Sequence, residues 1–470
     1  MNLVEKYAMP RALTRSQTID IVNEMAFFLR SGVHVLTGLV PALPAIEDKL
    51  AVVRCLAKDA EMADSFQNRL ESLRIFDDGP LGRPQGAIDL ARILEQAPDE
   101  ASALAGLRQV IRPGLISTCQ TFLEGADQLM DAKTTYLTRR TLHFLETLTL
   151  PDSTGNAEFL ARVESGWAQR NDGETNIEEF RCVAGPKLVE VARPEHCEFG
   201  VRGASRPLFW DLLRNKEEIA RFVHQLMDNC LLAAESISRF SHEAPYMSYE
   251  FHREMAAQAA SSVRQYRMLE RALTDMGYKY GDFTLDRSAY ELFVSFQPCE
   301  AGSPRELLWR LLLKITWFQA NELGPFQSEY IARSVLEQEE LAKIFGRLTC
   351  DAVEHVRVGL KWVQVLCDGD AGKAFEERKA VVVYLEQVQL ERRARYMVNH
   401  PKQAIAEMKE AEEITAAFKQ KSPEDLELST RRFSFKLRRA AGFPEEEILW
   451  AAEKLGHSFA IEDQEAIHAV

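Results

Sequence analysis

Along most of the chain, apolar residues recur at the three- and four-residue spacing of amphipathic helices, and strand patterns are scarce. This periodicity predicts helices over residues 16–36, 49–76, 87–96, 221–240, 250–276, 306–323 and 328–366. The run 115–150 contains few helix-breaking residues and is expected to form either one long helix or two helices with a bend. The pattern therefore predicts an all-α protein.

Glycine and proline mark the expected ends of these helices. The first helix is expected to stop at Gly38, with Pro41 beyond it, and Gly277 and Gly369 are expected to close two later helices. Residues 374–420 resemble a helical hairpin broken at His400-Pro401. Two shorter helices are expected around Gly442-Phe443-Pro444. The one plausible strand is 187–191, inside a glycine-rich stretch.

A chain of 470 residues is too long for one ordinary core and predicts several domains. Residues 58–73 and 260–276 form a weak internal repeat, because both carry arginine and then leucine near the end of a long amphipathic stretch. The organisation expected from this repeat and from the glycine-rich stretch is a helical bundle, a connector that partly packs on the helices, a second bundle and a helical extension. Their expected bounds are 1–150, 151–207, 208–370 and 371–470.

Charge and cysteine usage narrow the classes of function. The formal net charge is −14, which repels phosphate backbones and argues against nucleic-acid binding. Eight scattered cysteines without a CxxC pair are typical of a reducing cytoplasm, so a cytoplasmic protein is expected. The N-terminus shows no signal-peptide pattern, and no uninterrupted apolar run is long enough to cross a membrane, so no membrane association is expected.

Three segments in order resemble a family of ferritin-like proteins of largely unknown function. They are PYMSYEFHREMAAQAASSVRQYRMLERALTDMGYKYGDF at 245–283, LTCDAVEHVRVGLKWVQVLC at 348–367 and FSFKLRRAAGFPEEE at 433–447. The resemblance covers roughly residues 220–450, whereas residues 1–150 share only the general bundle pattern. It implies tandem ferritin-like bundles with a helical C-terminal extension.

In the parent fold, two helices each supply a glutamate and two others each supply Glu-x-x-His, which together hold a di-iron or di-manganese pair. The first motif has Ser262 and Gln265 at those aligned positions, and the second has Ala352 and His355. Gln319 aligns with the glutamate of the third helix, with Glu322 one turn later. In the first bundle, alanines replace both ligands within Asp59-Ala60-Glu61-Met62-Ala63. We therefore expect no resident metal and no other cofactor.

Three hypotheses follow from these replacements. The first is a metal-independent ferritin-like protein whose second bundle keeps a small-molecule pocket, as a repurposed biosynthetic enzyme or a binding protein. Glu235 and His355 are its candidate acid and base. The other residues expected to contact the ligand are Ser262, Gln265, Gln319 and Glu322.

The second hypothesis is a non-catalytic pseudoenzyme that acts as a scaffold by docking to another protein. The third is an oxidoreductase with a rebuilt single-metal or di-iron site, whose ligands would be Glu235, Glu322, Glu354 and His355. The expected partner is accordingly a small organic molecule or a protein, and a homodimer is left open.

Overall fold

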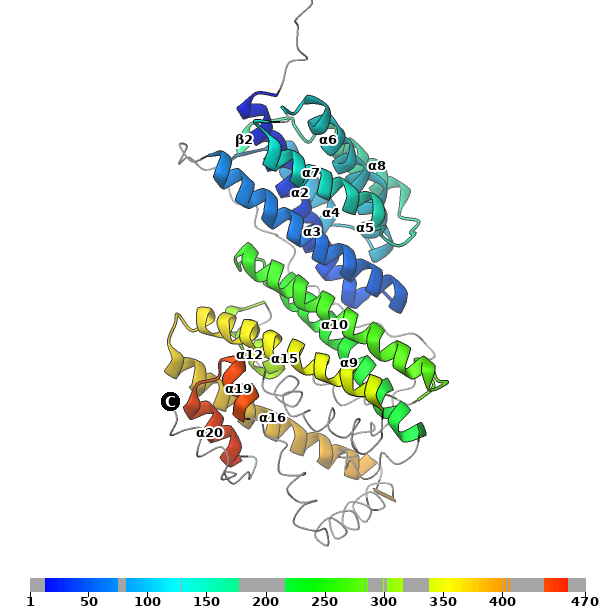
Figure 1. The fold of residues 1–470 in the computed structure, drawn as a ribbon, viewed down its shortest axis with the longest axis vertical. Coiled ribbons are helices and arrows are strands. Elements are labelled where there is room, and N and C mark those ends of the chain that lie inside the picture. Colours follow the sequence, from blue (N-terminus) through cyan, green and yellow to red (C-terminus); the bar gives the residue numbers. More distant parts are fainter. Residues whose placement is uncertain are drawn as a thin grey trace, which may run out of the picture. The chain divides into compact units, whose positions relative to one another are not determined.

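The fold is described from a computed structural model, in which residues 13–74, 82–127, 129–176, 216–283, 302–315, 338–399 and 435–454, with a few single residues between them, are placed well enough to describe. Helices dominate these residues, which confirms the all-α prediction (Figure 1). The one sheet in the described part pairs two-residue strands, β1 (Arg83–Pro84) and β2 (Thr175–Asn176), in antiparallel register. Whether the helices form tandem ferritin-like bundles stays a prediction.

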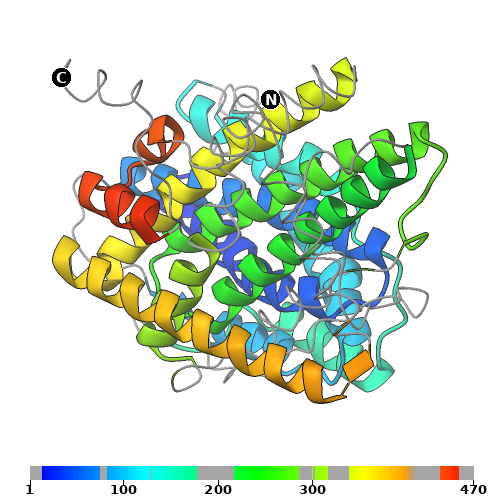
Figure 2. The same ribbon diagram turned by 90° about the horizontal axis from the view of Figure 1, so that it is seen from below.

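Contacts divide the described helices into two compact units. Unit 1 contains most of α9 (Lys216–Glu243) and α10 (Tyr249–Asp275), together with all of the preceding helices. These are α2 (Arg15–Ala42), α3 (Ile46–Leu73), α4 (Gln85–Glu95), α5 (Glu100–Gly106), the π-helix η1 (Leu107–Ile111), α6 (Arg112–Gly125), α7 (Ala132–Thr147) and α8 (Ala157–Ala168). Figures 1 and 2 both show α9 and α10 running side by side.

Unit 2 contains the later helices and the two short ends of α9 and α10. Its helices are α12 (Pro304–Leu313), α15 (Glu339–Leu366), α16 (Ala371–Asn399), α19 (Phe435–Ala441) and α20 (Glu445–Lys454). α15 packs closely on α12 and the residues just after it, since a Cβ atom at Gly359 would lie 2.8 Å from the side chain of Ile315. A larger residue at this position of α15 would therefore push the two helices apart.

Local sequence signals account for several helix ends. Thr14 caps α2, because its hydroxyl accepts from the backbone N–H of Gln17 while the Gln17 side chain accepts from the N–H of Thr14. Gly277, Gly369 and Gly442 all have positive φ angles just beyond helices, as predicted for the first two and consistent with the expected break around the third. The run 115–150 forms two helices, because α6 ends at Gly125 and α7 begins at Ala132.

α2 differs from its prediction, because it continues through Gly38 and Pro41 to Ala42. The cause is tertiary: Leu36, Leu39 and Val40 are all buried, so the apolar packing of this segment outweighs its helix-breaking residues. α2 is also the one described helix that is long and apolar enough to cross a membrane. However, 83% of its apolar window is buried inside the protein, as in the core helix of a soluble domain.

The stretch 151–207, expected to be a connector that partly packs on helices, contains α8 at its start, and α8 packs on α4 and α5. The strand expected at 187–191 lies outside the described residues.

Candidate functional site

Glu235, the candidate acid or base, lies on α9 and is completely buried in unit 1. Its Oε1 is 2.5 Å from the Nζ of Lys49 on α3, which is equally buried and also donates to the backbone oxygen of Pro41 at 3.0 Å. Lys49 was expected only to begin a helix, and no local sequence pattern indicates that its side chain is buried. The ammonium neutralises the carboxylate, so Glu235 is held in a structural ion pair that links α3 to α9.

Two of the expected ligand-contacting residues, Ser262 and Gln265, lie on α10 and are also buried. Cys230 on α9 places its Sγ 3.6 Å from Oε1 of Gln265, a weak thiol hydrogen bond across the two helices. Serine and glutamine carry no charge, so Ser262 and Gln265 do not supply the negative charge that a metal pair requires.

The remaining candidates lie elsewhere. His355 is buried on α15 in unit 2, while the neighbouring Glu354 points outward and pairs with Arg357 at 2.6 Å. Glu354 therefore does not contribute to a buried site within unit 2. Gln319 and Glu322 lie outside the described residues. The expectation that Gln319 and Glu322 contact a ligand stays a prediction.

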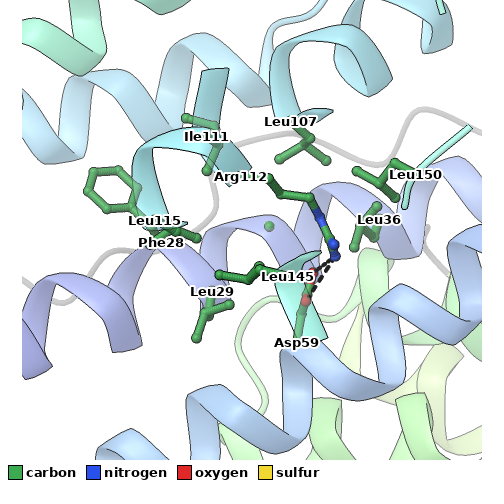
Figure 3. Close-up of a pocket in the computed structure, with 11 residues that line it drawn as sticks. Phe28, Leu29, Leu36, Asp59, Leu107, Ile111, Arg112, Leu115, Leu145 and Leu150 are labelled. Carbon is green, nitrogen blue, oxygen red and sulfur yellow. Dashed lines mark hydrogen bonds and ion pairs between the residues drawn. The ribbon is translucent and has the colours of Figure 1, made fainter. Parts of the chain in front are cut away.

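Sequence reasoning did not anticipate a small cavity in unit 1, between α2, α3, η1, α6 and α7 (Figure 3). Its volume is about 10 Å³, which is about enough for a single water molecule. The lining is apolar except for one ion pair. The lining residues are Phe28, Leu29, Gly32, Leu36, Asp59, Leu107, Ile111, Arg112, Leu115, Leu145 and Leu150.

The polar wall of this cavity is the pair formed by Asp59 and Arg112, which Figure 3 shows pointing toward each other. One guanidinium nitrogen of Arg112 donates to both carboxylate oxygens, at 2.9 and 2.7 Å, and the other donates to the backbone oxygen of Leu148 at 2.7 Å. Burial raises the pKa of the Asp59 carboxyl, and Arg112 partly offsets this effect. Because the pair is neutral as a whole, the cavity favours uncharged occupants.

One wall of the cavity is η1, which lies between α5 and α6. π-helical turns are rare and are enriched at functional sites, because their wider turn is less stable than α-helix and tends to be kept for a purpose. A small uncharged organic molecule could enter this cavity only if leucine side chains moved aside. In the described part of unit 1, this cavity is a place where the small-molecule hypothesis can be tested.

Two glycines on α2 provide a matched test of the packing. Gly32 lines the cavity, and a Cβ there would lie 3.9 Å from Leu107, whereas a Cβ at Gly38 would lie 2.8 Å from the ring of His242. We expect Gly32→Ala to raise the free energy of unfolding by about 0.5–1 kcal/mol, since alanine is the better helix former. Gly38→Ala should lower it by about 1–2 kcal/mol through overpacking. Urea titrations of both variants measure this, and shifts of the same sign would contradict the packing described.

Three histidines form a layer where α2, α9 and α10 meet in unit 1, and of these His34 is buried while His242 and His252 are half-buried. The rings of His34 and His242 stack with centroids 4.5 Å apart, and Nδ1 of His242 donates to the backbone oxygen of His34 at 3.1 Å. Nδ1 of His252 lies 2.8 Å from the hydroxyl of Ser241. This histidine layer joins the N-terminal helix pair to α9 and α10.

The surroundings of all three imidazoles favour the neutral form. Burial lowers the pKa of His34 well below its ordinary value, and His242 and His252 lower it further. Burial also lowers the pKa of His242, although its bond to His34 and the charge of Glu243 oppose this. Burial is the main cause that lowers the pKa of His252 to about 4. Protonation of any ring in this layer is therefore expected to destabilise the fold.

The described donors do not fit a di-iron pair. Among the residues that the structure describes, no three histidine, cysteine, aspartate or glutamate side chains are grouped to hold a metal ion. A divalent ion bound by Glu235 would also sit beside the ammonium of Lys49, 2.5 Å from the same carboxylate. In this buried environment the two positive charges would repel each other strongly.

Comparison of the chain with protein-family models, with curated proteins and with solved structures finds no match in any of the three.

Proposed function

We propose that the chain is a metal-independent helical protein of the ferritin-like type that acts as a scaffold, by docking to another protein. The observation that carries this proposal is the completely buried pair of Lys49 and Glu235. In a carboxylate-bridged metal site, the metal ions neutralise the acidic side chains. Here a lysine fixed within the core does so instead.

The neighbouring polar residues support the same proposal. Ser262 and Gln265 are buried and uncharged, and Gln265 is in contact with Cys230. Asp59, at the start of the corresponding segment of the first bundle, is paired with Arg112. Glu235 and Asp59 each have a basic partner, which favours a structural role over oxygen chemistry at a metal.

Elemental analysis and native mass spectrometry of the full chain test the proposal, after expression in medium supplemented with iron and manganese. We expect well under one metal equivalent per chain and an intact mass equal to that of the polypeptide. About two metal equivalents would instead establish a two-metal site and an oxidoreductase. A stoichiometric organic adduct would favour the small-molecule hypothesis, and either result would overturn the scaffold proposal.

A further inference from the structure

Two arginine side chains of unit 1 lie beside each other, one on α2 and one on β1. Arg30 follows Phe27 by three residues, so these two side chains lie one turn apart on α2. Cζ of Arg83 lies 4.8 Å from the centroid of the Phe27 ring, and Cζ of Arg30 lies 4.3 Å from the centroid of the Tyr249 ring. These contacts place two guanidinium groups of like charge next to each other, and they are named here the arginine pair.

Backbone contacts position Arg83. It pairs with Asn176 in the β1–β2 ladder, and Nδ2 of Asn23 on α2 donates to the backbone oxygen of Gly82 at 3.3 Å. Gly82 approaches β2 so closely that a Cβ atom there would collide with the side chain of Thr175. The strand pairing and this close approach therefore hold Arg83 beside α2.

Two positive charges meet at the arginine pair. Nε of Arg83 is buried and has no hydrogen-bond partner among the described residues. Burial lowers the pKa of Arg83 to about 10, and the charge of Arg30 contributes to this shift. Both groups stay protonated near neutral pH. Because both side chains are half-buried, water screens their repulsion only in part, and an anion bound between them would offset it.

The carboxylates described around Tyr249 are bound by other arginines. Burial raises the pKa of the Tyr249 phenol, and Asp64 and Asp59 raise it further, since both lie near this ring. Arg112 donates to both oxygens of Asp59, and Nε of Arg253 lies 3.7 Å from Oδ1 of Asp64. Each of these two carboxylates therefore has a guanidinium partner outside the arginine pair, which leaves the pair able to bind an anion from solution.

We propose that the arginine pair binds a phosphate group, either free inorganic phosphate or the phosphate of a small ester. Guanidinium groups donate pairs of hydrogen bonds to phosphate oxygens, and the aromatic rings beside Arg30 and Arg83 hold both groups in place before the ligand arrives. A phosphate dianion balances both charges of the pair, whereas chloride or a carboxylate balances only one. The half-buried position keeps the pair within reach of a small anion and strengthens the attraction relative to bulk water.

This site is separate from the buried pair of Lys49 and Glu235 and does not depend on the scaffold proposal. Two charge-assisted contacts at a half-buried position predict a dissociation constant of about 1 mM. Binding this weak is lost during buffer exchange before mass spectrometry, so the tests of the two proposals have independent outcomes.

Isothermal titration calorimetry of the full chain with sodium phosphate at about pH 7.5 tests the proposal, with sodium chloride keeping the ionic strength constant. We expect saturable binding of about one phosphate per chain. A parallel titration with glycerol 3-phosphate distinguishes the two sources. Binding of the ester that is tighter by about tenfold or more identifies a small phosphate ester, and equal or weaker binding identifies the free ion. No saturable binding of either compound overturns the proposal.

Arg83→Met should weaken phosphate binding by about tenfold or more, because it removes one of the two charges and keeps an apolar side chain over Phe27. Without phosphate, the variant should be at least as stable as the wild type, because the repulsion from Arg30 is removed. In urea titrations, phosphate should stabilise the wild type more than the variant. This comparison cancels the general effect of phosphate salts on folding, and equal stabilisation of both proteins contradicts the site.

Arg30→Met is the second variant and should weaken phosphate binding to a similar extent. The matched control is Arg170→Met, because Arg170 also lies over a ring in unit 1, 4.4 Å from the centroid of Trp167, but pairs with Glu24 at 2.8 Å. This replacement should leave the phosphate affinity unchanged, and circular dichroism should show all three variants folded. Unchanged affinity in both Arg83→Met and Arg30→Met, or an equal loss in Arg170→Met, overturns the proposal.

Discussion

Replacing Lys49 with methionine is expected to lower the free energy of unfolding by about 3–5 kcal/mol, because it leaves the carboxylate of Glu235 in the core without its ammonium partner. Both side chains are completely buried, so water cannot replace the lost charge without opening the packing between α3 and α9. Urea titration at neutral pH measures the change, and circular dichroism before denaturation verifies the native helix content.

The double variant Lys49→Met/Glu235→Leu removes both charges, and so distinguishes the effect of an unpaired charge from the effect of altered packing. Replacement of a buried ion pair by apolar side chains of similar size is often neutral or stabilising, so most of the lost stability should return. The control is Glu354→Gln, which breaks the exposed pair with Arg357 and should change stability by no more than about 0.5 kcal/mol. Equal destabilisation by Lys49→Met and Glu354→Gln would show that the buried pair has no special role.

Acidification from pH 6.5 to pH 4 should destabilise unit 1 through its histidine layer. All three pKa values are lowered in the folded protein, to about 4 for His252. The unfolded chain, whose histidines titrate near 6.5, therefore binds more protons in this window. The sign follows from linkage: stability is full above about pH 6.5 and falls as the pH drops toward the folded pKa values.

We expect the histidine layer to remove at least about 3 kcal/mol of stability across this window, since one lowered pKa unit corresponds to about 1.36 kcal/mol. Glu95, whose Oε1 lies 3.9 Å from Nε2 of His34, and Glu243 beside His242 would offset part of the cost, whereas Arg30 adds to it. Urea titrations between pH 7.5 and 4 measure the slope.

His252→Gln isolates this contribution from the titration of carboxylates. It should reduce the acid-induced loss by roughly 2 kcal/mol, because glutamine can keep a hydrogen bond to Ser241 without taking up a proton. His143 on α7 is exposed, so His143→Gln should leave the pH dependence unchanged. A pH profile that is identical in wild type and His252→Gln would refute the role of the layer.

The candidate site shows which of its features the local sequence pattern predicts and which it does not. The ligand-position alignment pointed to Glu235, Ser262 and Gln265, and all three are buried on α9 and α10. The pattern could not pair Glu235 with Lys49, because the partners are separated by 186 residues. Polar residues inside amphipathic helices can be recognised one at a time, but their partners depend on how distant helices dock.

The sequence by itself determined that this protein is helical and where most of its helices end, because the 3.6-residue apolar period and the glycines with positive φ act within a few residues. Only the tertiary structure decided that α2 continues through Gly38 and Pro41, that Asp59 meets Arg112, and that His34 stacks on His242. The physical reason is that burial and charge pairing depend on neighbours in space. Burial can override a local helix-breaking residue, and a distant basic residue can neutralise an acidic one although the nearby sequence gives no sign of it.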